Sequence, residues 1–384
     1  MQRIGSNLSK GVTGAVVAAV ATLLPGAGLA QLSTLVPLDT VSLAPPLTCG
    51  DVTVFDADDV ATLCVDPSLT IPLVVSSCPQ TVGPGFFRLA NDVVCADNTA
   101  FIVVADNTII DLNGHKVVCT GAGFKGSCQG PGAGTEPDVG VDTGGHNNVH
   151  VFSHVPGGTI NGFDRGIDIK GGSNVKVKQL TITGPPSSGR GTNPRPQTQG
   201  IHVMGVTCGG GNIHLGGGVN TGNDVSNHTE GIELEQADCV EIGHNLVHDN
   251  NSDPFECHGI VADNSAHNNI HGNDVEANGE DLGIDGGLTL QGLSTTDSIV
   301  TNNVVSNNNG DGISARRGAF GNQIVNNTML FNGVPFAGSF FFDAASGPQR
   351  ANGAAVNFWD FNNVCNTQTT PEPPPGVCGP TEGP

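Results

Sequence analysis

Between residues 231 and 332 the chain repeats one pattern of apolar and polar positions four times. Each pass holds three short runs in which apolar and polar residues alternate, with Gly or Asn between the runs. The first pass consists of residues 231–235, 239–242 and 245–250, and the later passes begin at Gly259, Gly287 and Gly312. Alternation is the period of a β-strand, and Gly and Asn readily adopt the left-handed conformation of tight bends. The pattern therefore predicts three short strands per pass, with no helical pattern between them.

The repeat has a nearly fixed length. The opening glycines at positions 231, 259, 287 and 312 are separated by steps of 28, 28 and 25 residues. Such a period indicates a solenoid, because one turn cannot bury its own apolar face and must stack on its neighbours. Three strands per turn predict an all-β fold, a single-stranded parallel β-helix. The residues that stacking would align are Ile232, Ile260, Leu288 and Ile313 inside the coils, and Asn250, Asn278, Asn308 and Asn332 in a hydrogen-bonded ladder at a corner.

Residues 106–117, DNTIIDLNGHKV, and the later Gly-Ile and Asn-x-Val-x-x-Asn turns carry a family resemblance. They are similar to secreted right-handed parallel β-helix repeat proteins of the pectin-lyase-like superfamily, and residues 362–365 resemble the last coil of such proteins. The resemblance spans about residues 49–379 and implies a right-handed parallel β-helix. It does not fix the function, because the superfamily contains lyases, hydrolases, epimerases, adhesins and inert scaffolds.

Five segments are expected along the chain. Residues 1–30 have the features of a secretory signal peptide: a basic start, an apolar run and a small-residue cleavage site. The segments that follow are a linker at 31–48, an N-terminal cap at 49–105, the parallel β-helix at 106–368 and a disordered tail at 369–384. We therefore expect a secreted, periplasmic or cell-surface protein, a monomer with no membrane span in the mature chain.

The charge of the chain limits its partners. The formal net charge is −22, and loss of Arg3 and Lys10 with the signal peptide brings the mature value to −24. A field of this sign repels nucleic acid and anionic lipid, so neither is expected as a partner. It also opposes an anionic polysaccharide unless divalent cations take part.

Eleven cysteines in an exported chain predict disulfide bonds. Cys208 and Cys239 each lie seven residues after the isoleucine that follows an opening Gly, at positions 201 and 232. They would therefore stack on adjacent coils within disulfide distance. The other expected pairs are local ones, Cys119 with Cys128 and Cys365 with Cys378. No C-x-x-C unit is present in the sequence, so a zinc site is not expected.

Alternation also separates inward from outward positions in the first strand of each turn. If Ile167 points into the core, Asp168 and Lys170 point out, and the same register in later turns predicts a charged outer face. The members of this face are Arg165, Asp168, Lys170, His202, Glu230, Glu233, Glu235, His258, Asp263 and Arg316. Rows on neighbouring strands would lie ~5 Å apart. We expect these side chains to be exposed.

The charged face supports two hypotheses of function. Charged residues on an outer strand face are usually only solvated, which favours a non-catalytic binding, adhesin or structural β-helix. Carboxylates crowded beside two histidines favour instead a lyase or epimerase that acts on a uronate polysaccharide or cell-surface glycan with the help of Ca²⁺. The roles in this second hypothesis are catalysis by Lys170, His202 and His258, substrate binding by Arg165, Asp168 and Arg316, and calcium binding by Glu233, Glu235 and Asp263.

Short catalytic motifs of related enzymes do not match. Polygalacturonase-type hydrolases carry a Gly-His-Gly motif, whereas residues 243–245 read Gly-His-Asn. Mannuronan C5-epimerases carry Asp-Pro-His-Asp, and the similar residues 253–256 have Phe255 where that family has its catalytic His. The chain also contains no tyrosine, so a lyase would need another proton donor. These departures favour the non-catalytic hypothesis and leave both open.

Overall fold

The computed structural model describes residues 71–365, with gaps at 97–98, 121–136, 186–197, 210–212, 219, 252–256, 280–285, 333–341, 344–356 and 360–361. The expected signal peptide, linker and tail, and residues 49–70 of the expected cap, lie outside the described residues. All the described residues belong to one compact unit. Throughout the part that the structure describes, the regular elements are β-strands.

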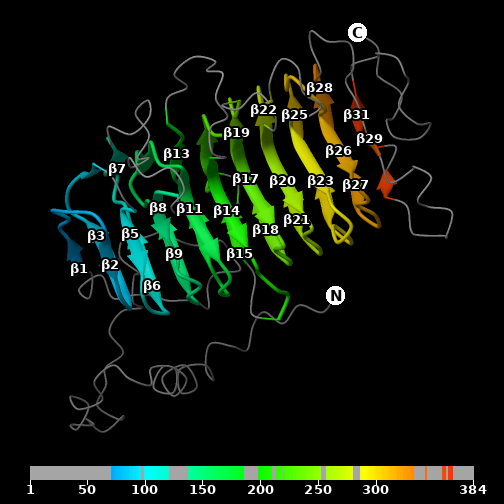
Figure 1. Cartoon of the computed structure of the whole chain (residues 1–384). Helices are drawn as coiled ribbons and strands as arrows, with labels where there is room; N and C mark the ends of the chain where they lie inside the picture. The colour runs from blue at the N-terminus through cyan, green and yellow to red at the C-terminus, as the bar shows by residue number, and fades with distance from the viewer. Residues whose placement is uncertain are drawn as a thin grey trace, which may run out of the picture. The chain divides into compact units, whose positions relative to one another are not determined.

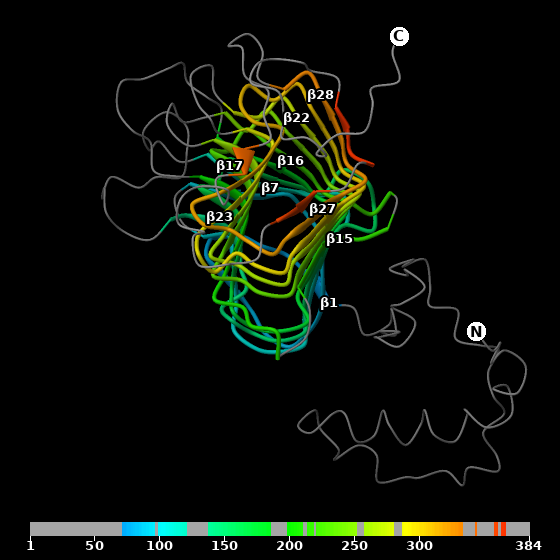
Figure 2. The ribbon, with the colours of Figure 1, turned by 90° about the vertical axis from the view of Figure 1, so that its right-hand side faces the viewer.

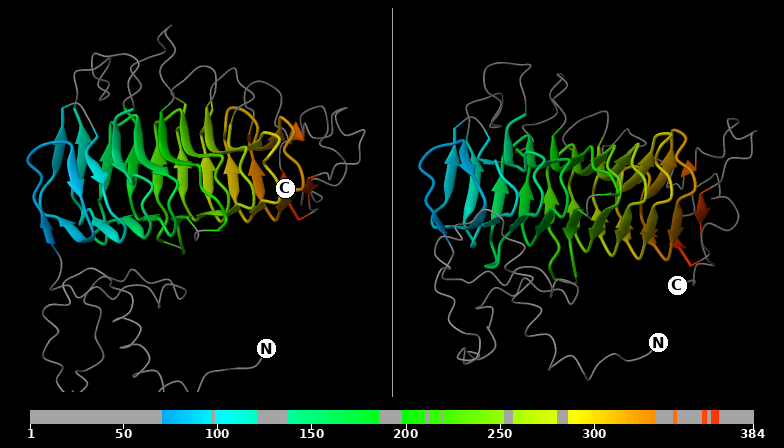
Figure 3. Two further views of the ribbon diagram at one scale, coloured as in Figure 1. Left: turned by 60° about the horizontal axis from the view of Figure 1, so that its bottom comes forward. Right: turned by 90° about the horizontal axis from the view of Figure 1, so that it is seen from below.

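The strands form three sheets whose neighbouring strands are parallel. The chain passes through sheet B, sheet A and sheet C in turn and returns to sheet B one coil further along the stack. One such coil consists of β17 (Glu230–Glu235), β18 (Val240–Gly243), β19 (Leu246–His248) and then β20 (His258–Asp263) (Figure 1). Successive coils superpose when the stack is viewed along its axis (Figure 2), and the same order of strands is visible from two other directions (Figure 3). The fold is a right-handed parallel β-helix. The repeat predicted the parallel β-helix, and the family resemblance implied its hand.

The bounds of the strands follow the order of each sheet. Sheet A contains β1 (Ile71–Leu73), β3 (Gly85–Leu89), β6 (Thr108–Asp111), β9 (Val149–Phe152), β12 (Lys176–Lys178), β15 (Ile213–Gly216), β18 (Val240–Gly243), β21 (Asn269–His271), β24 (Ile299–Thr301), β27 (Gln323–Val325) and β30 (Phe358–Trp359). Sheet B contains β2 (Gln80–Val82), β5 (Phe101–Val103), β8 (Val139–Asp142), β11 (Arg165–Lys170), β14 (Gln199–Met204), β17 (Glu230–Glu235), β20 (His258–Asp263), β23 (Leu288–Gln291), β26 (Ile313–Arg316) and β29 (Phe342–Asp343). Sheet C contains β4 (Val93–Cys95), β7 (Lys116–Cys119), β10 (Thr159–Asn161), β13 (Thr181–Thr183), β16 (Asp224–Ser226), β19 (Leu246–His248), β22 (Asp274–Glu276), β25 (Val304–Ser306), β28 (Thr328–Leu330) and β31 (Val364–Cys365). Coils therefore already begin within residues 71–105, the part of the expected cap that the structure describes.

One continuous apolar core runs through the stack. Ile232 pairs with Ile260, Ile260 with Leu288, and Leu288 with Ile313, all in register. All four side chains are completely buried. The column expected from the repeat is therefore confirmed, and each coil buries apolar surface that it could not bury alone.

A glycine near the start of the strands of sheet B is required by the packing of the coil. A Cβ atom added to Gly231 would lie 2.4 Å from Cγ1 of Val247 and 2.6 Å from the carbonyl oxygen of Gly259. At Gly200 the corresponding atom would lie 2.2 Å from Cγ1 of Val225. The backbone thus bends so closely over sheet C that no side chain fits, which explains why these glycines recur in the sequence.

Asparagine ladders join the coils at two corners. In the expected ladder Nδ2 of Asn250 donates to Oδ1 of Asn278 at 2.9 Å, and Asn278 and Asn308 continue the series to Asn332 at 3.0 and 2.9 Å. A second ladder, which we did not predict, consists of Asn223, Asn245, Asn273, Asn303, Asn327 and Asn363. These side chains are buried, so the ladders satisfy backbone and side-chain groups that water does not reach.

The described disulfides agree in part with the expected pairs. Cys208 and Cys239 are bonded, with Cα atoms 5.1 Å apart, as their stacking predicted. A second bond joins Cys78 to Cys95 and was not predicted. Cys119 is also disulfide-bonded. The partners expected for Cys119 and Cys365, at positions 128 and 378, lie outside the described residues. In the part of the chain that the structure describes, no helix is long and apolar enough to cross a membrane.

The longest connections lead from sheet C to sheet B. Residues 120–138 separate β7 from β8, and residues 184–198 separate β13 from β14. In contrast, residues 162–164 are sufficient to join β10 to β11. Additional chain length is therefore inserted at the corner that leads into sheet B.

Candidate functional site

The outer face of sheet B carries three columns of residues in register. One column contains Asp142, Asp168, His202 and Glu233, and a second contains Lys170, Met204, Glu235 and Asp263. The third contains Arg165, Gln199, Glu230 and His258. The structure therefore brings most of the residues expected on this face together on four successive strands, β11, β14, β17 and β20. We refer to Arg165, Asp168, Lys170, His202, Glu233 and Glu235 as the His202 site.

The expected exposure of this face is wrong for several residues. The side chains of Asp168 and His202 are 0% exposed. His258 and Arg316 are buried as well. The outward register is as expected, but charged groups on adjacent coils pair with one another instead of facing water. Burial of such groups is tolerated only when partners compensate for the lost hydration.

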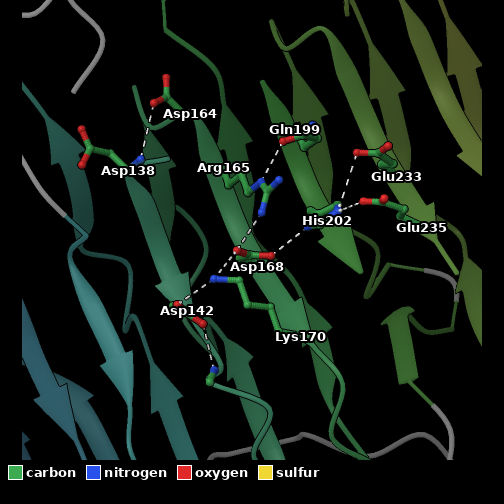
Figure 4. A network of polar contacts seen from close by, with 11 residues as sticks. Asp138, Asp142, Asp164, Arg165, Asp168, Lys170, Gln199, His202, Glu233 and Glu235 are labelled. Carbon is green, nitrogen blue, oxygen red and sulfur yellow. Dashed lines mark hydrogen bonds and ion pairs between the residues drawn. The ribbon is translucent and has the colours of Figure 1, made fainter. Parts of the chain in front are cut away.

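Asp168 is the centre of the His202 site (Figure 4). Its Oδ2 atom lies 3.0 Å from Nη1 of Arg165 and 3.0 Å from Nζ of Lys170, and its Oδ1 atom lies 2.8 Å from Nδ1 of His202. Burial alone would raise the pKa of Asp168, but the hydrogen bonds from His202 and Lys170 and the charge of Arg165 lower it to about 2. Asp168 is therefore an ionised carboxylate at neutral pH.

The other ring nitrogen of His202 faces two glutamates on the next coil. Nε2 lies 3.4 Å from Oε2 of Glu235 and 3.8 Å from Oε2 of Glu233. The shorter contact of Nδ1 with Asp168 assigns the ring hydrogen to Nδ1 and directs Nε2 toward the glutamates (Figure 4). Glu235 is 42% exposed and Glu233 only 13%. Glu235 is thus the member of this group that a bound molecule meets first.

Glu233 differs from Glu235 in its environment. Burial raises the pKa of Glu233, and the nearby charge of Glu235 acts in the same direction. A side-chain hydrogen bond with Glu230 and, when the ring is protonated, the charge of His202 lower this pKa and offset the rise in part. Glu230 is buried and lies on the same strand, β17. The two glutamates of the site are therefore not chemically equivalent, because one is largely buried and the other half-exposed.

Lys170 does not have the environment of a base. Its ammonium group lies 3.0 Å from Asp168 and 3.2 Å from Asp142. Partial burial alone would lower the pKa of Lys170, but the hydrogen bonds and charges of these two carboxylates raise it above its usual value. A lysine that acts as a base needs the opposite shift. The geometry therefore favours Lys170 as a permanent cation and does not support its predicted role as a base.

Two partners in this region were not predicted from the sequence. Asp142 accepts a hydrogen bond from Lys170, and Gln199 accepts one from Nε of Arg165 at 2.9 Å. Gln199 directly precedes the opening Gly200, so the position was visible in the repeat. Asp142 follows the insertion at residues 121–136, which hides its register in the sequence.

His258 and Arg316 form a second group on the same face. Nη2 of Arg316 lies 2.9 Å from Nε2 of His258, and Nδ1 of His258 lies 3.2 Å from the hydroxyl oxygen of Thr289. Nε of Arg316 donates to Gln291 at 3.1 Å. Burial, together with the charges of Arg316 and Arg317, lowers the pKa of His258 well below its usual value. His258 is therefore a neutral, structurally constrained imidazole.

The residues expected to bind calcium do not form such a site. Oδ1 of Asp263 accepts a hydrogen bond from Nδ2 of Asn264 at 2.9 Å, while Glu233 and Glu235 face His202. Among the described residues, no group of three or more His, Cys, Asp or Glu side chains is arranged to hold a metal ion. Calcium prefers six to eight oxygen ligands, which this arrangement does not supply. The donor set therefore does not fit the ion.

Comparison with known proteins agrees with the fold. A family model described as a right-handed beta helix region matches residues 165–346. This match and the three parallel sheets define the class of the protein: a right-handed parallel β-helix protein. No curated protein matches the sequence.

Three solved structures show similar folds. The Dettilon tailspike protein is 14% identical with a TM-score of 0.46, and the match covers 77% of this chain and 63% of the tailspike. The A-module of the mannuronan C-5 epimerase AlgE6 from Azotobacter vinelandii is 14% identical with a TM-score of 0.35, over 78% of this chain and 89% of the module. The tailspike protein of Escherichia coli bacteriophage HK620, solved as a double mutant in complex with a pentasaccharide, is 12% identical with a TM-score of 0.42, over 78% of this chain and 59% of the tailspike. The chain thus spans less than two thirds of these tailspike chains.

Proposed function

We propose that this protein is an extracellular carbohydrate-active β-helix protein, a lyase or epimerase acting on uronate polysaccharide at the outer face of sheet B. The observation that carries the proposal is the series Asp168, His202 and Glu235. A buried carboxylate holds one ring nitrogen of His202, and the other ring nitrogen faces a half-exposed carboxylate. The described disulfides support an extracytoplasmic location, because such bonds persist in oxidising compartments.

Glu235 is the proposed base. Its carboxylate removes the proton from C5 of a uronate residue and passes it to Nε2 of His202. Asp168 stabilises the resulting imidazolium, because its own pKa of about 2 keeps it ionised. His202 and Asp168 are positioning residues in this scheme, since both are buried behind Glu235.

The cations beside Asp168 are the proposed carboxylate-binding groups. Lys170 and Arg165 are partly exposed, at 33% and 19%, and lie next to the series that ends at Glu235. The substrate carboxylate takes up charge when the C5 proton leaves, and a nearby fixed cation stabilises that charge. Fixed protein cations in this place support a reaction that needs no metal ion. Arg316 remains a predicted substrate-binding residue further along the face.

The proposal is tested by incubating the protein with pectate, alginate and related polymers, with and without calcium. New absorbance from unsaturated ends identifies a lyase, and a change of C5 configuration seen by NMR identifies an epimerase. We expect Glu235→Gln to lower the rate by about 10²-fold, the usual contribution of a general base. Glu276→Gln on sheet C is the matched control and should leave the rate unchanged. Absence of both products with every polymer would remove the enzymatic proposal.

A second candidate function is a non-catalytic glycan-binding or structural β-helix. The complete burial of Asp168 and His202 favours it, because ion-pair networks that serve only stability have the same appearance. Calorimetry with the same polymers separates the two. Binding without turnover, and with an affinity that Glu235→Gln does not change, would support the non-catalytic function.

A further inference from the structure

The outer face of sheet A carries lysines and histidines on three successive strands, β12 and its two neighbours β9 and β15 (Figure 1). In register, Lys176 of β12 lies between His150 of β9 and His214 of β15. Lys178 lies two residues further along β12, on the same face as Lys176. The sequences of these three strands contain no acidic residue. We refer to His150, Lys176, Lys178 and His214 as the Lys178 cluster.

Two members of the cluster are shielded from water although they lie on an outer face. Lys178 is 4% exposed and His150 is 8% exposed. Further along the same face, His214 and its neighbour in register, Glu241, are 32% and 34% exposed. Charges interact more strongly where water is excluded, because the effective dielectric constant is lower. A positive charge in the cluster therefore acts more strongly than one at the exposed end of the face.

His150 has a ring nitrogen that the protein leaves unpaired. Its Nε2 atom is buried and has no hydrogen-bond partner. Nε2 is the ring nitrogen farther from the backbone, so it points outward, to the side on which the lysines lie. Burial and the charge of Lys178, together with that of His214 when its ring is protonated, lower the pKa of His150 to about 4, so the ring is neutral at neutral pH. A buried polar atom without a partner costs free energy, which a ligand can recover.

The carboxylates on the strands beyond the cluster already have partners. Oε2 of Glu241 on β18 lies 3.0 Å from Nδ1 of His214, and its Oε1 lies 3.0 Å from Nε2 of His271. On the other side, Oδ2 of Asp111 on β6 lies 2.9 Å from Nε of Arg88. Neither carboxylate reaches the unpaired ring nitrogen. The ligand that this place favours is an anion, because the lysines repel a cation.

We propose that the Lys178 cluster is a binding site for one oxyanion group, a carboxylate or a sulfate. The anion accepts hydrogen bonds from the ammonium groups of Lys176 and Lys178 and from Nε2 of His150, in the tautomer that carries its hydrogen there. The formal net charge of −22 opposes anions over the molecule as a whole, so a local group of cations is needed to hold one. The site lies on sheet A and does not depend on the function proposed for the outer face of sheet B.

Histidine NMR tests the site without any enzymatic activity. We would label the histidine rings of the full chain with ¹³C and add galacturonate, inorganic sulfate or glucose at an ionic strength held constant with NaCl. The resonance of His150 is the one that is lost in His150→Gln. Galacturonate or sulfate should shift this resonance in a saturable manner near neutral pH. Either anion should also raise the pKa of His150 by at least about one pH unit, because a nearby negative charge stabilises the imidazolium. Glucose should have no effect.

Two lysine variants separate the cluster from the general charge of the surface. Lys178→Gln should weaken the binding of the anion about tenfold, because one charge-assisted hydrogen bond is lost. Lys116 is an exposed lysine on β7 of sheet C, so Lys116→Gln is the matched control and should leave the affinity unchanged. Tighter binding of galacturonate identifies the ligand as a uronate carboxylate, and tighter binding of sulfate identifies it as a sulfate ester.

A response that NaCl alone or glucose reproduces would overturn the proposal, since it would show only ionic screening or an adventitious additive. An unchanged His150 resonance in the wild type with both anions would do the same, even if the variants did not fold. Equal affinities of Lys178→Gln and Lys116→Gln would exclude the cluster as the place of binding. A wild type that binds an anion at His150 but turns over no polymer supports this site while the proposed function fails.

Discussion

The Nδ1 atom of His202 lies 2.8 Å from the Oδ1 atom of Asp168, although the two residues are 34 positions apart in the chain. They are vertical neighbours on β14 and β11, and one coil of the solenoid separates them. The contact depends on register alone, because a slip of one residue would turn one of the side chains into the core. Predictions about the site are therefore also predictions about the stack.

Asp168→Asn should destabilise the protein by about 3 kcal/mol, because it leaves Arg165, Lys170 and His202 around an uncharged amide. Asp263→Asn on the same face is the control, with an expected change below about 0.5 kcal/mol. The folded-state pKa of Asp168 is depressed to about 2, so its contribution is complete above the unfolded value near 3.8 and is lost as the pH falls toward 2. Denaturant unfolding at several pH values measures this. Equal effects of the two variants at neutral pH would contradict the prediction.

At His248 we expect the free energy of unfolding to depend on pH with the opposite sign. Its ring nitrogens lie 2.9 Å from Asp224 and 2.8 Å from Asp249. Burial alone would lower the pKa of His248, but the hydrogen bonds to the two carboxylates raise it above 6.5. The contribution of His248 to stability is therefore complete below about pH 6.5, and it is lost as the pH rises through the pKa of His248 in the folded state. Because His248 is partly exposed, we expect it to contribute only about 0.5 kcal/mol to the free energy of unfolding.

Thermal unfolding of His248→Gln between about pH 6 and pH 9 tests this dependence. The stability gap to the wild type should be larger at the lower pH. A gap that grows with pH would have the wrong sign and would refute the assignment.

Asn250→Ala should destabilise the protein by about 3 kcal/mol. The asparagine accepts from the backbone N–H of His228 at 3.0 Å, and its Nδ2 donates to Val225 at 3.2 Å and to Asn278 at 2.9 Å. Removing it leaves these buried groups unsatisfied, at about 1–3 kcal/mol each before relaxation. Asn251 is exposed, so Asn251→Ala should change the free energy of unfolding by less than about 0.5 kcal/mol. Similar denaturant unfolding midpoints for the two variants would show that the ladder contributes little to stability.

Gly231→Ala should be destabilising by about 3 kcal/mol or more, since the new methyl group overlaps Val247 and the backbone of Gly259. At Gly209 a Cβ atom would meet no other atom within 4 Å, so Gly209→Ala should be neutral or slightly stabilising. Equilibrium unfolding in urea compares the two. An unperturbed midpoint for Gly231→Ala would mean that the bend does not need glycine.

Much of the fold was predictable because the repeat encodes it directly. The equal spacing of Ile232, Ile260 and Leu288 determined the internal column. The common offset of seven residues from positions 201 and 232 paired Cys208 with Cys239. The second ladder follows the same repeat, since Asn245 and Asn273 are one repeat apart. It was not predicted because we considered only the asparagines at the end of each pass. Where insertions interrupt the period, as before Asp142, register could not be read from the sequence.

The site was predictable in position but not in environment. Alternation placed Asp168 and His202 on the outer face, yet it cannot show that neighbouring coils bury them. Lys170 looked like a base because spacing does not reveal that Asp142 and Asp168 hold its ammonium group. The ion pair between Arg165 and Asp168 joins positions i and i+3 of one strand, a contact that a regular two-residue period does not predict.

The long connections from sheet C to sheet B have an evolutionary consequence. Because the ladders and the core determine the stack independently of these segments, a segment such as residues 184–198 can change length without shifting any coil. Each one leads in sequence into a strand of sheet B, so it can be exchanged as a unit. Grafting such segments between related solenoids would change the chain that precedes these strands while the scaffold stays constant.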